Sequence, residues 1–197
     1  MSRKHRIWFP GATYHITARG NRKALIFFDD HDHQKFLTIV KETKEIYPFD
    51  LHSYCLMKNH IHFLLETANI PITDIMKTIN TTYAIYLNKR HELNGHVFQG
   101  RFHSELITDA KYFLNTSRYI HLNPLEAEMV TNLQDYHWSS LPSFFSSAKN
   151  SLVSKEKILS FFPEPQIENY LKFLHAPNKK AEYILASLKR EETLCWS

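Results

Sequence analysis

The 197-residue sequence predicts an α+β protein built on one antiparallel sheet, and three observations lead to that class. Runs of alternating apolar and polar residues, typical of half-buried strands, are separated by longer runs with helical spacing of apolar residues. Turn signals such as Gly20-Asn21 and Asn94-Gly95 fall between them. The order strand, helix, two strands, helix, strand is that of a ferredoxin-like split βαβ unit. We therefore expect a ferredoxin-like antiparallel sheet with helices on one face.

The first half of this unit consists of a strand, a helix and a hairpin. Thr13 to Ala18 alternates as a strand does. Asp29 and Asp30 offer caps for a helix, which Pro48 ends. Two further strands are joined by a turn so short that an antiparallel hairpin is the simplest connection: Leu51 to Met57, Lys58-Asn59, and His60 to Glu66.

The second half consists of a helix, a strand and a further helix. Pro71 starts a helix that ends near His91, and Val97 to Ile107 is a strand candidate. Thr108 caps a third helix, from Asp109 to about Leu122, which Pro124 is expected to end because proline disfavours helical geometry at the preceding residue.

Beyond Leu133 the sequence becomes irregular and keeps only short helical pieces. These are Lys155 to Phe162, Ile167 to His175 and Lys180 to Arg190. We expect two parts: a main domain over residues 1–145 and a small helical C-terminal appendage over residues 146–197.

Composition indicates a folded globular protein, with 43% hydrophobic residues and only four glycines. No window approaches the roughly 18 apolar residues of a spanning helix, and the first residues lack the apolar run of a signal peptide. We expect a cytoplasmic protein without a membrane partner. Cys55 and Cys195 have no CxxC partner, so they indicate reduced thiols and neither a zinc site nor a disulfide framework.

Positive charge is concentrated in the first 28 residues. The chain has a net charge of +4; this stretch has six basic and no acidic residues, so the remainder sums to −2: Arg3, Lys4, Arg6, Arg19, Arg22 and Lys23. A polyanion is the natural partner of such a stretch. A solvated basic tail is the alternative, but Arg19 and Arg22 end a strand-like segment and do not lie in a tail.

His60 and His62 form an HxH pair within a predicted strand. Alternate side chains of a strand share a face, so both imidazoles point the same way, with Cα atoms roughly 6–7 Å apart. That spacing allows both rings to reach one metal ion. A chance pair remains the alternative, because the chain has 13 histidines.

A stripe of four residues follows one face of the third helix, at steps of four, three and four: Tyr112, Thr116, Tyr119 and Asn123. Taken alone, such a stripe is more often part of a core. If the helix lies against the histidines, Asn123 offers an oxygen ligand and Tyr119 a nucleophile. Tyr119 is favoured over Tyr112 because Asn123 lies one turn beyond it.

This set of groups suits cleavage of a DNA phosphodiester. A phenol, with an unperturbed pKa of about 10, needs a base, a cation or a polarised target to attack at neutral pH. A divalent ion on the phosphate stabilises the developing negative charge. The products are a 5′-phosphotyrosine and a free 3′ hydroxyl, and exchanging one phosphodiester for another lets the strand be rejoined without ATP.

Five segments in order strengthen this reading: YHITARGNR (14–22), MKNHIHFLL (57–65), GHVFQGRFHS (95–104), RYIHLNP (118–124) and DYHWSS (135–140). Together they resemble the single-tyrosine HUH transposases of the IS200-like family, most closely the REP-associated tyrosine transposases. The resemblance covers about residues 10 to 145.

The resemblance implies a transposase that cleaves and rejoins single-stranded DNA at REP-like hairpins, with Mg²⁺ or Mn²⁺ as cofactor and a ferredoxin-like catalytic domain. It implies that His60 and His62 are metal ligands, that Asn123 completes the metal site, and that Tyr119 is the nucleophile. The sequence departs from its relatives at Lys58, where they usually have proline, and at Glu126 and Glu128, near which they have a basic residue and a glycine.

Residues expected to contact DNA surround these motifs. Cationic side chains track phosphates, and aromatic side chains stack on bases of single strands. Arg101 is the strongest candidate in its segment, because Phe98 and Phe102 equally suit a core. Lys58 is placed to contact a phosphate beside the metal site, and the basic N-terminal residues are placed to hold a hairpin: Arg3, Lys4, Arg6, Arg19, Arg22 and Lys23.

Two alternatives stay open. A ferredoxin-like sheet can bind hairpin DNA or RNA without catalysis, although binding alone does not require the histidine and tyrosine set. A metal-dependent phosphodiesterase that activates water would not need Tyr119. We expect no small-molecule substrate, and a monomer is favoured over a dimer.

Overall fold

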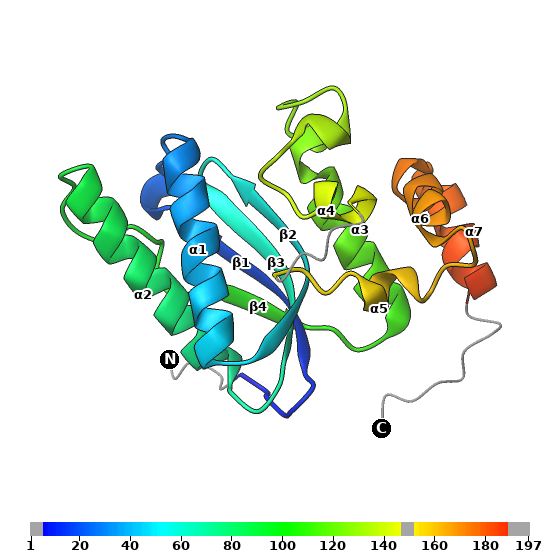
Figure 1. Ribbon diagram of the computed structural model, residues 1–197, viewed down its shortest axis with the longest axis horizontal. Coiled ribbons are helices and arrows are strands. Elements are labelled where there is room, and N and C mark those ends of the chain that lie inside the picture. The colour runs from blue at the N-terminus through cyan, green and yellow to red at the C-terminus, as the bar shows by residue number, and fades with distance from the viewer. Residues whose placement is uncertain (1–5, 147–151, 189–197) are drawn as a thin grey trace.

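A four-stranded antiparallel sheet lies at the centre of the computed structural model, which describes residues 6–146 and 152–188 (Figure 1). Its strands are β1 (Thr13–Arg19), β2 (Phe49–Met57), β3 (His60–Thr67) and β4 (His103–Leu106). They are ordered β2-β3-β1-β4, and each neighbouring pair is antiparallel. Because β3 lies between β1 and β2, as in a split βαβ unit, the predicted α+β class and antiparallel sheet are confirmed.

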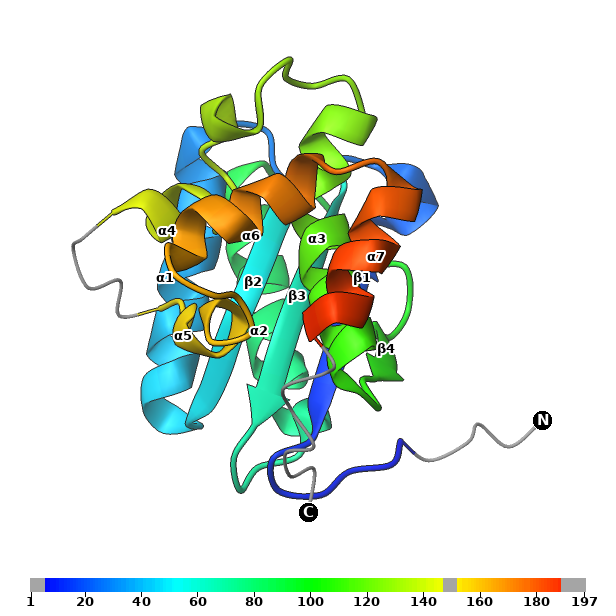
Figure 2. The same ribbon diagram turned by 90° about the vertical axis from the view of Figure 1, so that its right-hand side faces the viewer.

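Helices cover both faces of this sheet (Figure 1). One face is covered by α1 (Asp30–Ile46) and α2 (Ile72–Arg90). The opposite face is covered by α3 (Ala110–Glu126) and, outside it, by shorter helices: α4 (Pro142–Phe145), α5 (Glu156–Leu159), α6 (Gln166–His175) and α7 (Asn178–Leu188). Figure 2, seen from that side, shows α3, α6 and α7 in front of the sheet. The expectation of helices on one face therefore describes α1 and α2 and is incomplete for the rest.

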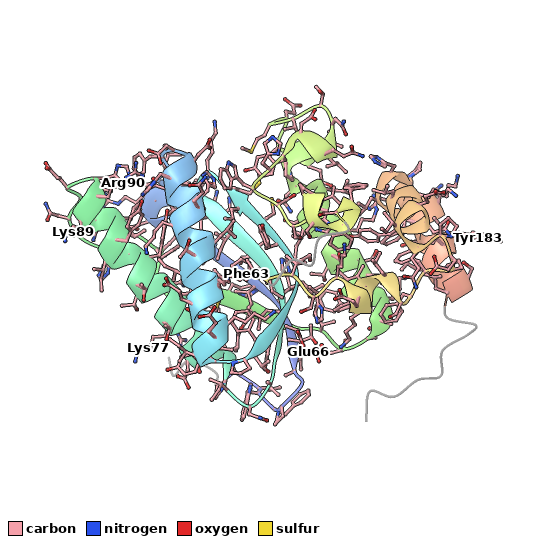
Figure 3. All side chains as sticks on the ribbon, in the orientation of Figure 1. Phe63, Glu66, Lys77, Lys89, Arg90 and Tyr183 are labelled. Atoms are coloured by element: carbon pink, nitrogen blue, oxygen red, sulfur yellow. The ribbon has the colours of Figure 1, made fainter. Side chains whose placement is uncertain are left out.

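Alternation along β3 explains why both faces are covered. Ile61, Phe63 and Leu65 are fully buried, and Phe63 packs on Phe36 of α1 with ring centroids 6.1 Å apart. Glu66 points to the opposite face, where it meets Lys157 of α5 (Figure 3). The α1 and α2 face is therefore the apolar core, and the other face combines apolar and polar side chains.

A cluster of charged groups joins the start of α1 to the end of α2. The Asp29 side chain caps α1 by accepting from the backbone N–H of Asp32 at 3.1 Å, as the sequence predicted for this residue. Arg90, the last residue of α2, forms bonds of 2.7 Å to both Asp29 oxygens and also binds the buried Asp32 (Figure 3). The two helices are thus fixed to each other at one end.

Two predicted boundaries are wrong. The strand expected over Val97 to Ile107 is regular only from His103 to Leu106. The chain bends at Gly100, where φ is +68°, and Phe98 pairs with Gly20 only as an isolated bridge. Pro124 lies inside α3 and does not end it. Proline near a helix end removes one hydrogen bond, to the carbonyl four residues earlier, and α3 continues for only two more residues.

Helical pieces occur in the C-terminal part, as expected, with bounds shifted by up to three residues where they can be compared. The predicted end at Arg190 lies outside the described residues. The predicted division at residue 145 stays a prediction. Two short 3₁₀ helices complete the description, at Asn21–Lys23 and Leu133–Asp135. Within residues 6–146 and 152–188, no helix is both long and apolar enough to span a lipid bilayer.

Candidate active site

His60 and His62 lie on the face of β3 that α3 covers. The register places His60 opposite Arg19 of β1, and His62 opposite Thr17 of β1 and Cys55 of β2. The two imidazole centroids are 4.9 Å apart, and the rings are nearly perpendicular. The expectation that both histidines share one face is confirmed.

The tautomer of His60 follows from its neighbour Asn59. The Asn59 amide nitrogen donates to the carbonyl oxygen of Lys23 at 3.2 Å, so its carbonyl oxygen faces His60, where it lies 2.6 Å from Nδ1. An amide oxygen can only accept, and therefore His60 Nδ1 carries the proton. The lone pair of His60 is consequently on Nε2, which is the atom a metal ion would bind.

One ring nitrogen of His62 is also engaged by a neighbouring side chain. Its Nδ1 lies 3.2 Å from Nε2 of His15 in β1. His62 is only 5% exposed, and its Nε2 is buried without a hydrogen-bond partner among the described residues. A buried polar atom without a partner is costly, so a metal ion at Nε2 would remove an unfavourable feature of the fold. The site therefore suits a divalent ion.

Burial keeps these imidazoles neutral, as metal ligands must be. It lowers the pKa of His62 to about 3, with further lowering by the neighbouring His60 and His15. Burial, and then the charge of Arg19, lowers the pKa of His60. Burial also lowers the pKa of His15.

Tyr119 projects from α3 toward the histidines. Its ring centroid lies 5.4 Å from that of His62 and 5.8 Å from that of His15, with the rings close to perpendicular in both cases. The side chain is 43% exposed, so a substrate can reach it. The structure thus brings the predicted nucleophile to the predicted metal ligands.

Tyr112, the other tyrosine of the stripe, is engaged elsewhere. Its hydroxyl donates to Glu105 at 2.6 Å. Burial and this hydrogen bond raise the pKa of Tyr112 to about 12, which disfavours its phenolate. Hydrogen bonding therefore supports the choice of Tyr119 as the nucleophile.

Asn123 lies one turn beyond Tyr119 and is buried. Its amide nitrogen donates to the Tyr119 carbonyl oxygen at 2.8 Å, which leaves Oδ1 as the atom suited to a hard cation. No hydrogen bond joins Asn123 to His60 or His62 in the described structure. Across residues 6–146 and 152–188, no group of three His, Cys, Asp or Glu side chains could hold a metal ion. An ion bound by the two histidines would thus need oxygen ligands, from Asn123 or from a phosphate.

His15 is the functional candidate that the sequence analysis did not single out. Its side chain shares a face of β1 with Thr17 and Arg19, and the register places it opposite Glu105 of β4. The available signal was a histidine within the strand predicted from Thr13 to Ala18.

Four of the predicted DNA-binding residues gather at the end of the sheet beside His60, and all four are exposed: Arg19, Arg22, Lys23 and Lys58. Backbone hydrogen bonds join the loop that begins at Gly20 to the hairpin turn, from Gly20 to Asn59 at 2.8 Å and from Ile26 to Lys58 at 2.9 Å. A Cβ on Gly20 would lie 2.1 Å from the Ala24 carbonyl oxygen, so only glycine fits there. We call these four residues the basic rim.

The remaining predicted contacts differ in accessibility. Arg101 is exposed. Arg6 binds the Ser104 hydroxyl at 2.9 Å and the Phe102 carbonyl oxygen, and its guanidinium lies 4.0 Å from the centre of the Phe102 ring, so its contacts are internal. Phe102 itself is buried, as the core alternative expected. Arg3 and Lys4 lie outside the described residues.

Fold and site together define a class: a ferredoxin-like α+β protein whose sheet presents two histidines to a tyrosine on a covering helix. The family model described as "Transposase IS200 like" matches residues 9–123, more than half of the chain. The chain therefore belongs to the IS200-like transposase family, and this family indicates a DNA-cleaving kind of enzyme.

One relative and one solved structure are similar to this chain. A Haemophilus influenzae protein assigned provisionally as a REP-associated tyrosine transposase is 26% identical over 154 residues, which are 71% of this chain and 85% of that protein. A solved structure described as a REP-associated tyrosine transposase bound to a REP hairpin has a TM-score of 0.63 at 17% identity, covering 78% of this chain and 98% of the other. The second likeness concerns the fold.

Proposed function

We propose that this protein is a REP-associated tyrosine transposase that cleaves and rejoins single-stranded DNA at hairpins through a covalent link to Tyr119, with Mg²⁺ or Mn²⁺ as cofactor. The observation that carries the proposal is the Tyr119 ring beside His62, whose buried Nε2 has no hydrogen-bond partner within residues 6–146 and 152–188. The names of the two relatives support the hairpin substrate.

Each residue of the site has a distinct task. His60 and His62 would hold the ion through their Nε2 atoms, and Asn123 would complete its ligands through Oδ1. When bound, the divalent ion supplies charge stabilisation at the scissile phosphate. His15, by accepting from Nδ1–H of His62, holds that ring in the tautomer and orientation that leave Nε2 available.

The transfer step exchanges one phosphodiester for another. The Tyr119 oxygen forms a bond to phosphorus, the bond from phosphorus to the 3′ oxygen breaks, the phenol proton is released and the 3′ oxygen leaves as an alcohol. Attack by another 3′ hydroxyl reverses these changes and restores the phenol. No hydrolysis of a nucleotide is required, because the bonds formed and broken are of the same kind.

The basic rim would carry most of the DNA affinity. Its four cations lie at the end of the sheet where β3 begins, so a strand held there passes beside His60. Phosphate contacts of this kind position a nucleic acid without reading its bases. Binding and cleavage thus depend on different side chains.

That separation provides the test. His60→Ala and His62→Ala should abolish Mn²⁺-dependent cleavage of a labelled REP-like hairpin with single-stranded flanks, while hairpin affinity changes by no more than about threefold, since the cations that bind phosphates remain. His31→Ala, at an exposed histidine of α1, is the matched control and should behave as the unsubstituted protein. Equal loss of affinity and cleavage would make the histidines structural, and absence of cleavage by the unsubstituted protein would favour the non-catalytic binder.

A further inference from the structure

Two of the segments that carry the family resemblance, RYIHLNP (118–124) and DYHWSS (135–140), contain residues without a role in the proposed cleavage or metal binding. Arg118 and His121 flank Tyr119 on α3, and Ser140 ends the DYHWSS segment. His121 is 1% exposed, and its Nε2 lies 2.7 Å from the Ser140 hydroxyl oxygen. The two segments are therefore joined inside the protein.

This junction lies on the opposite side of α3 from the tyrosine. Successive residues of a helix are about 100° apart, so Ser117 and His121 project about 160–200° away from Tyr119. Tyr119 meets the histidines of the sheet, whereas Ser117 and His121 meet α6. Helix α6 thus contacts α3 on the face that points away from Tyr119 (Figure 2).

A continuous chain of buried hydrogen bonds forms the contact. The Tyr54 backbone N–H donates to Ser140 Oγ at 2.9 Å, which lies beside His121 Nε2. His121 Nδ1 is 2.7 Å from the Tyr170 hydroxyl, and that hydroxyl is 2.8 Å from Ser117 Oγ. Each ring nitrogen of His121 lies beside a hydroxyl group, so a ring with one donor and one acceptor satisfies both contacts. Each hydrogen bond of this network then has one donor and one acceptor. Donation runs from the Tyr54 N–H to Ser140, on to His121 and Tyr170, and ends at Ser117.

Arg118 adds a second attachment, at the end of α6. Its guanidinium donates to the carbonyl oxygen of Phe173 at 3.1 Å, to that of Ala176, and to Asn178 Oδ1 at 3.2 Å. Phe173 and Ala176 lie in the last turn and at the C-cap of α6, where carbonyl groups lack helical partners and a positive charge is favoured. Arg118 therefore caps α6 from α3.

A polar contact of this kind constrains α3 more tightly than an apolar one. Leaving a buried polar group unpaired is unfavourable, so every hydrogen bond of this network opposes rotation or sliding of α3. A displacement of about 1 Å at a reacting group can lower a rate about 10²-fold. Holding the face of α3 that carries Ser117 and His121 consequently fixes the position of Tyr119 on the opposite face.

We propose that Tyr170, His121 and Arg118 are positioning residues for the cleavage reaction, which hold α3 so that Tyr119 is presented to His60 and His62. The proposal rests on the proposed function. It extends the part of the chain needed for cleavage beyond residue 123, where the family match ends, to the C-terminal helices.

Tyr170→Phe tests this directly, because it keeps the ring and removes one hydroxyl. We expect single-turnover cleavage of the hairpin to fall about 10- to 100-fold, because Tyr119 is no longer held in place. We expect hairpin affinity to stay within about twofold, because the basic rim is untouched. Arg118→Lys, which keeps the charge but loses the planar fork, should show the same separation of rate from affinity.

The matched control is Tyr14→Phe, at a similarly buried tyrosine of β1 whose hydroxyl donates to the Ile7 carbonyl oxygen at 2.7 Å. It removes the same group on the other side of the sheet, so it should lower stability similarly and leave the cleavage rate unchanged. A Tyr170→Phe protein that cleaves as fast as Tyr14→Phe would overturn the proposal, as would a parallel loss of affinity.

A spectroscopic measurement separates position from activity. With 3-fluorotyrosine at position 119, Mn²⁺ bound at the histidines should broaden the ¹⁹F resonance, and the broadening should weaken in Tyr170→Phe as the ring moves away. Equal broadening in both proteins would contradict positioning. If the unsubstituted protein shows neither cleavage nor broadening, the proposed function itself fails, which is a different result from a Tyr170→Phe protein that matches an active parent.

Discussion

Each imidazole of the candidate site has one ring nitrogen engaged by a neighbour. His60 Nδ1 faces an amide oxygen of Asn59, and His62 Nδ1 faces His15. Partners of this kind fix ring orientation and strengthen metal ligands. The chemical character of the site therefore depends on residues that would not themselves touch an ion.

His15 provides the residue-scale prediction. His15→Phe keeps an aromatic ring but removes the acceptor for His62 Nδ1–H, so we expect Mn²⁺ affinity to fall about 10- to 100-fold, the usual effect of losing such a partner. Isothermal titration and the EPR signal of free Mn²⁺ measure it. His15→Gln, whose amide oxygen can accept, should restore part of the affinity, and an unchanged affinity in His15→Phe would contradict the orienting role.

The sequence allowed His60 and His62 to be placed on one face, because alternation along a strand is local. It did not place His15 with them. That placement requires the register of β1 against β3, and a shift of one residue would turn His15 to the other face. Tyr119 was chosen over Tyr112 from the spacing to Asn123, whereas the physical distinction, the Glu105 hydrogen bond, comes from a separate strand.

At the scale of elements, the loop from Gly20 to Phe27 determines where half of the basic rim lies. Arg22 and Lys23 have positive φ angles of 52° and 65°, and the loop closes tightly on Gly20. Backbone bonds hold it against the hairpin turn that carries Lys58. The proposed DNA-binding surface therefore depends on the shape of this loop as well as on its charge.

Gly20→Ala should disrupt that shape. The added Cβ would meet the Ala24 carbonyl oxygen at 2.1 Å, and backbone atoms must shift to relieve the contact. We expect a loss of about 1–3 kcal/mol in the free energy of unfolding, as in other overpacked sites, together with weaker hairpin binding. Chemical denaturation and hairpin titration measure the two effects.

Arg22→Ala is the comparison at the same loop. It removes a phosphate contact without a steric clash, so it should reduce the salt dependence of binding by about one unit of slope while stability stays within about 0.5 kcal/mol. If Gly20→Ala left both stability and binding unchanged, the close contact would have no role.

Element types and order were predictable because hydrophobic periodicity and caps are local signals. Asp29 caps α1 and the tight Lys58-Asn59 turn joins β2 to β3, as expected. The two errors arise where tertiary structure prevails over local preference. Gly100 bends the chain away from β1 before β4 begins, and α3 tolerates Pro124 within its final turn.

At the scale of the whole molecule, Glu66 connects the sheet to the C-terminal helices. Its carboxylate lies 3.1 Å from His52 Nε2 of β2 and also binds Lys157 of α5. Burial alone would raise the pKa of Glu66, but the hydrogen bonds from His52 and Lys157 outweigh it and hold the pKa at about 2. The pairing thus contributes stability that depends on pH.

The sign follows from comparison with the ordinary carboxyl pKa of 4.5. Because the folded value is lower, the contribution is complete above about pH 4.5 and is lost as the pH falls toward 2. Glu66→Gln should therefore lower the free energy of unfolding at pH 5, and its difference from the unsubstituted protein should shrink by pH 2.5. Urea unfolding across this range measures the difference.

Glu45→Gln, at an exposed residue of α1, is the control and should show no such trend. A Glu66→Gln difference of equal size at pH 5 and pH 2.5 would contradict the pairing. The contact of Glu66 with α5 was not foreseeable from the sequence, since 91 residues separate it from Lys157.

A covalent bond between DNA and Tyr119 is the central claim, and trapping it is the most direct test. After reaction of a hairpin oligonucleotide with the protein and Mn²⁺, denaturation and proteolysis should leave a nucleotide phosphate on the peptide that contains Tyr119, identified by mass spectrometry. Tyr112→Phe should retain the adduct, and Tyr119→Phe should lose both adduct and cleavage by at least about 10³-fold, as expected when a nucleophile is removed. An adduct on another residue, or cleavage by Tyr119→Phe at the unsubstituted rate, would contradict the account.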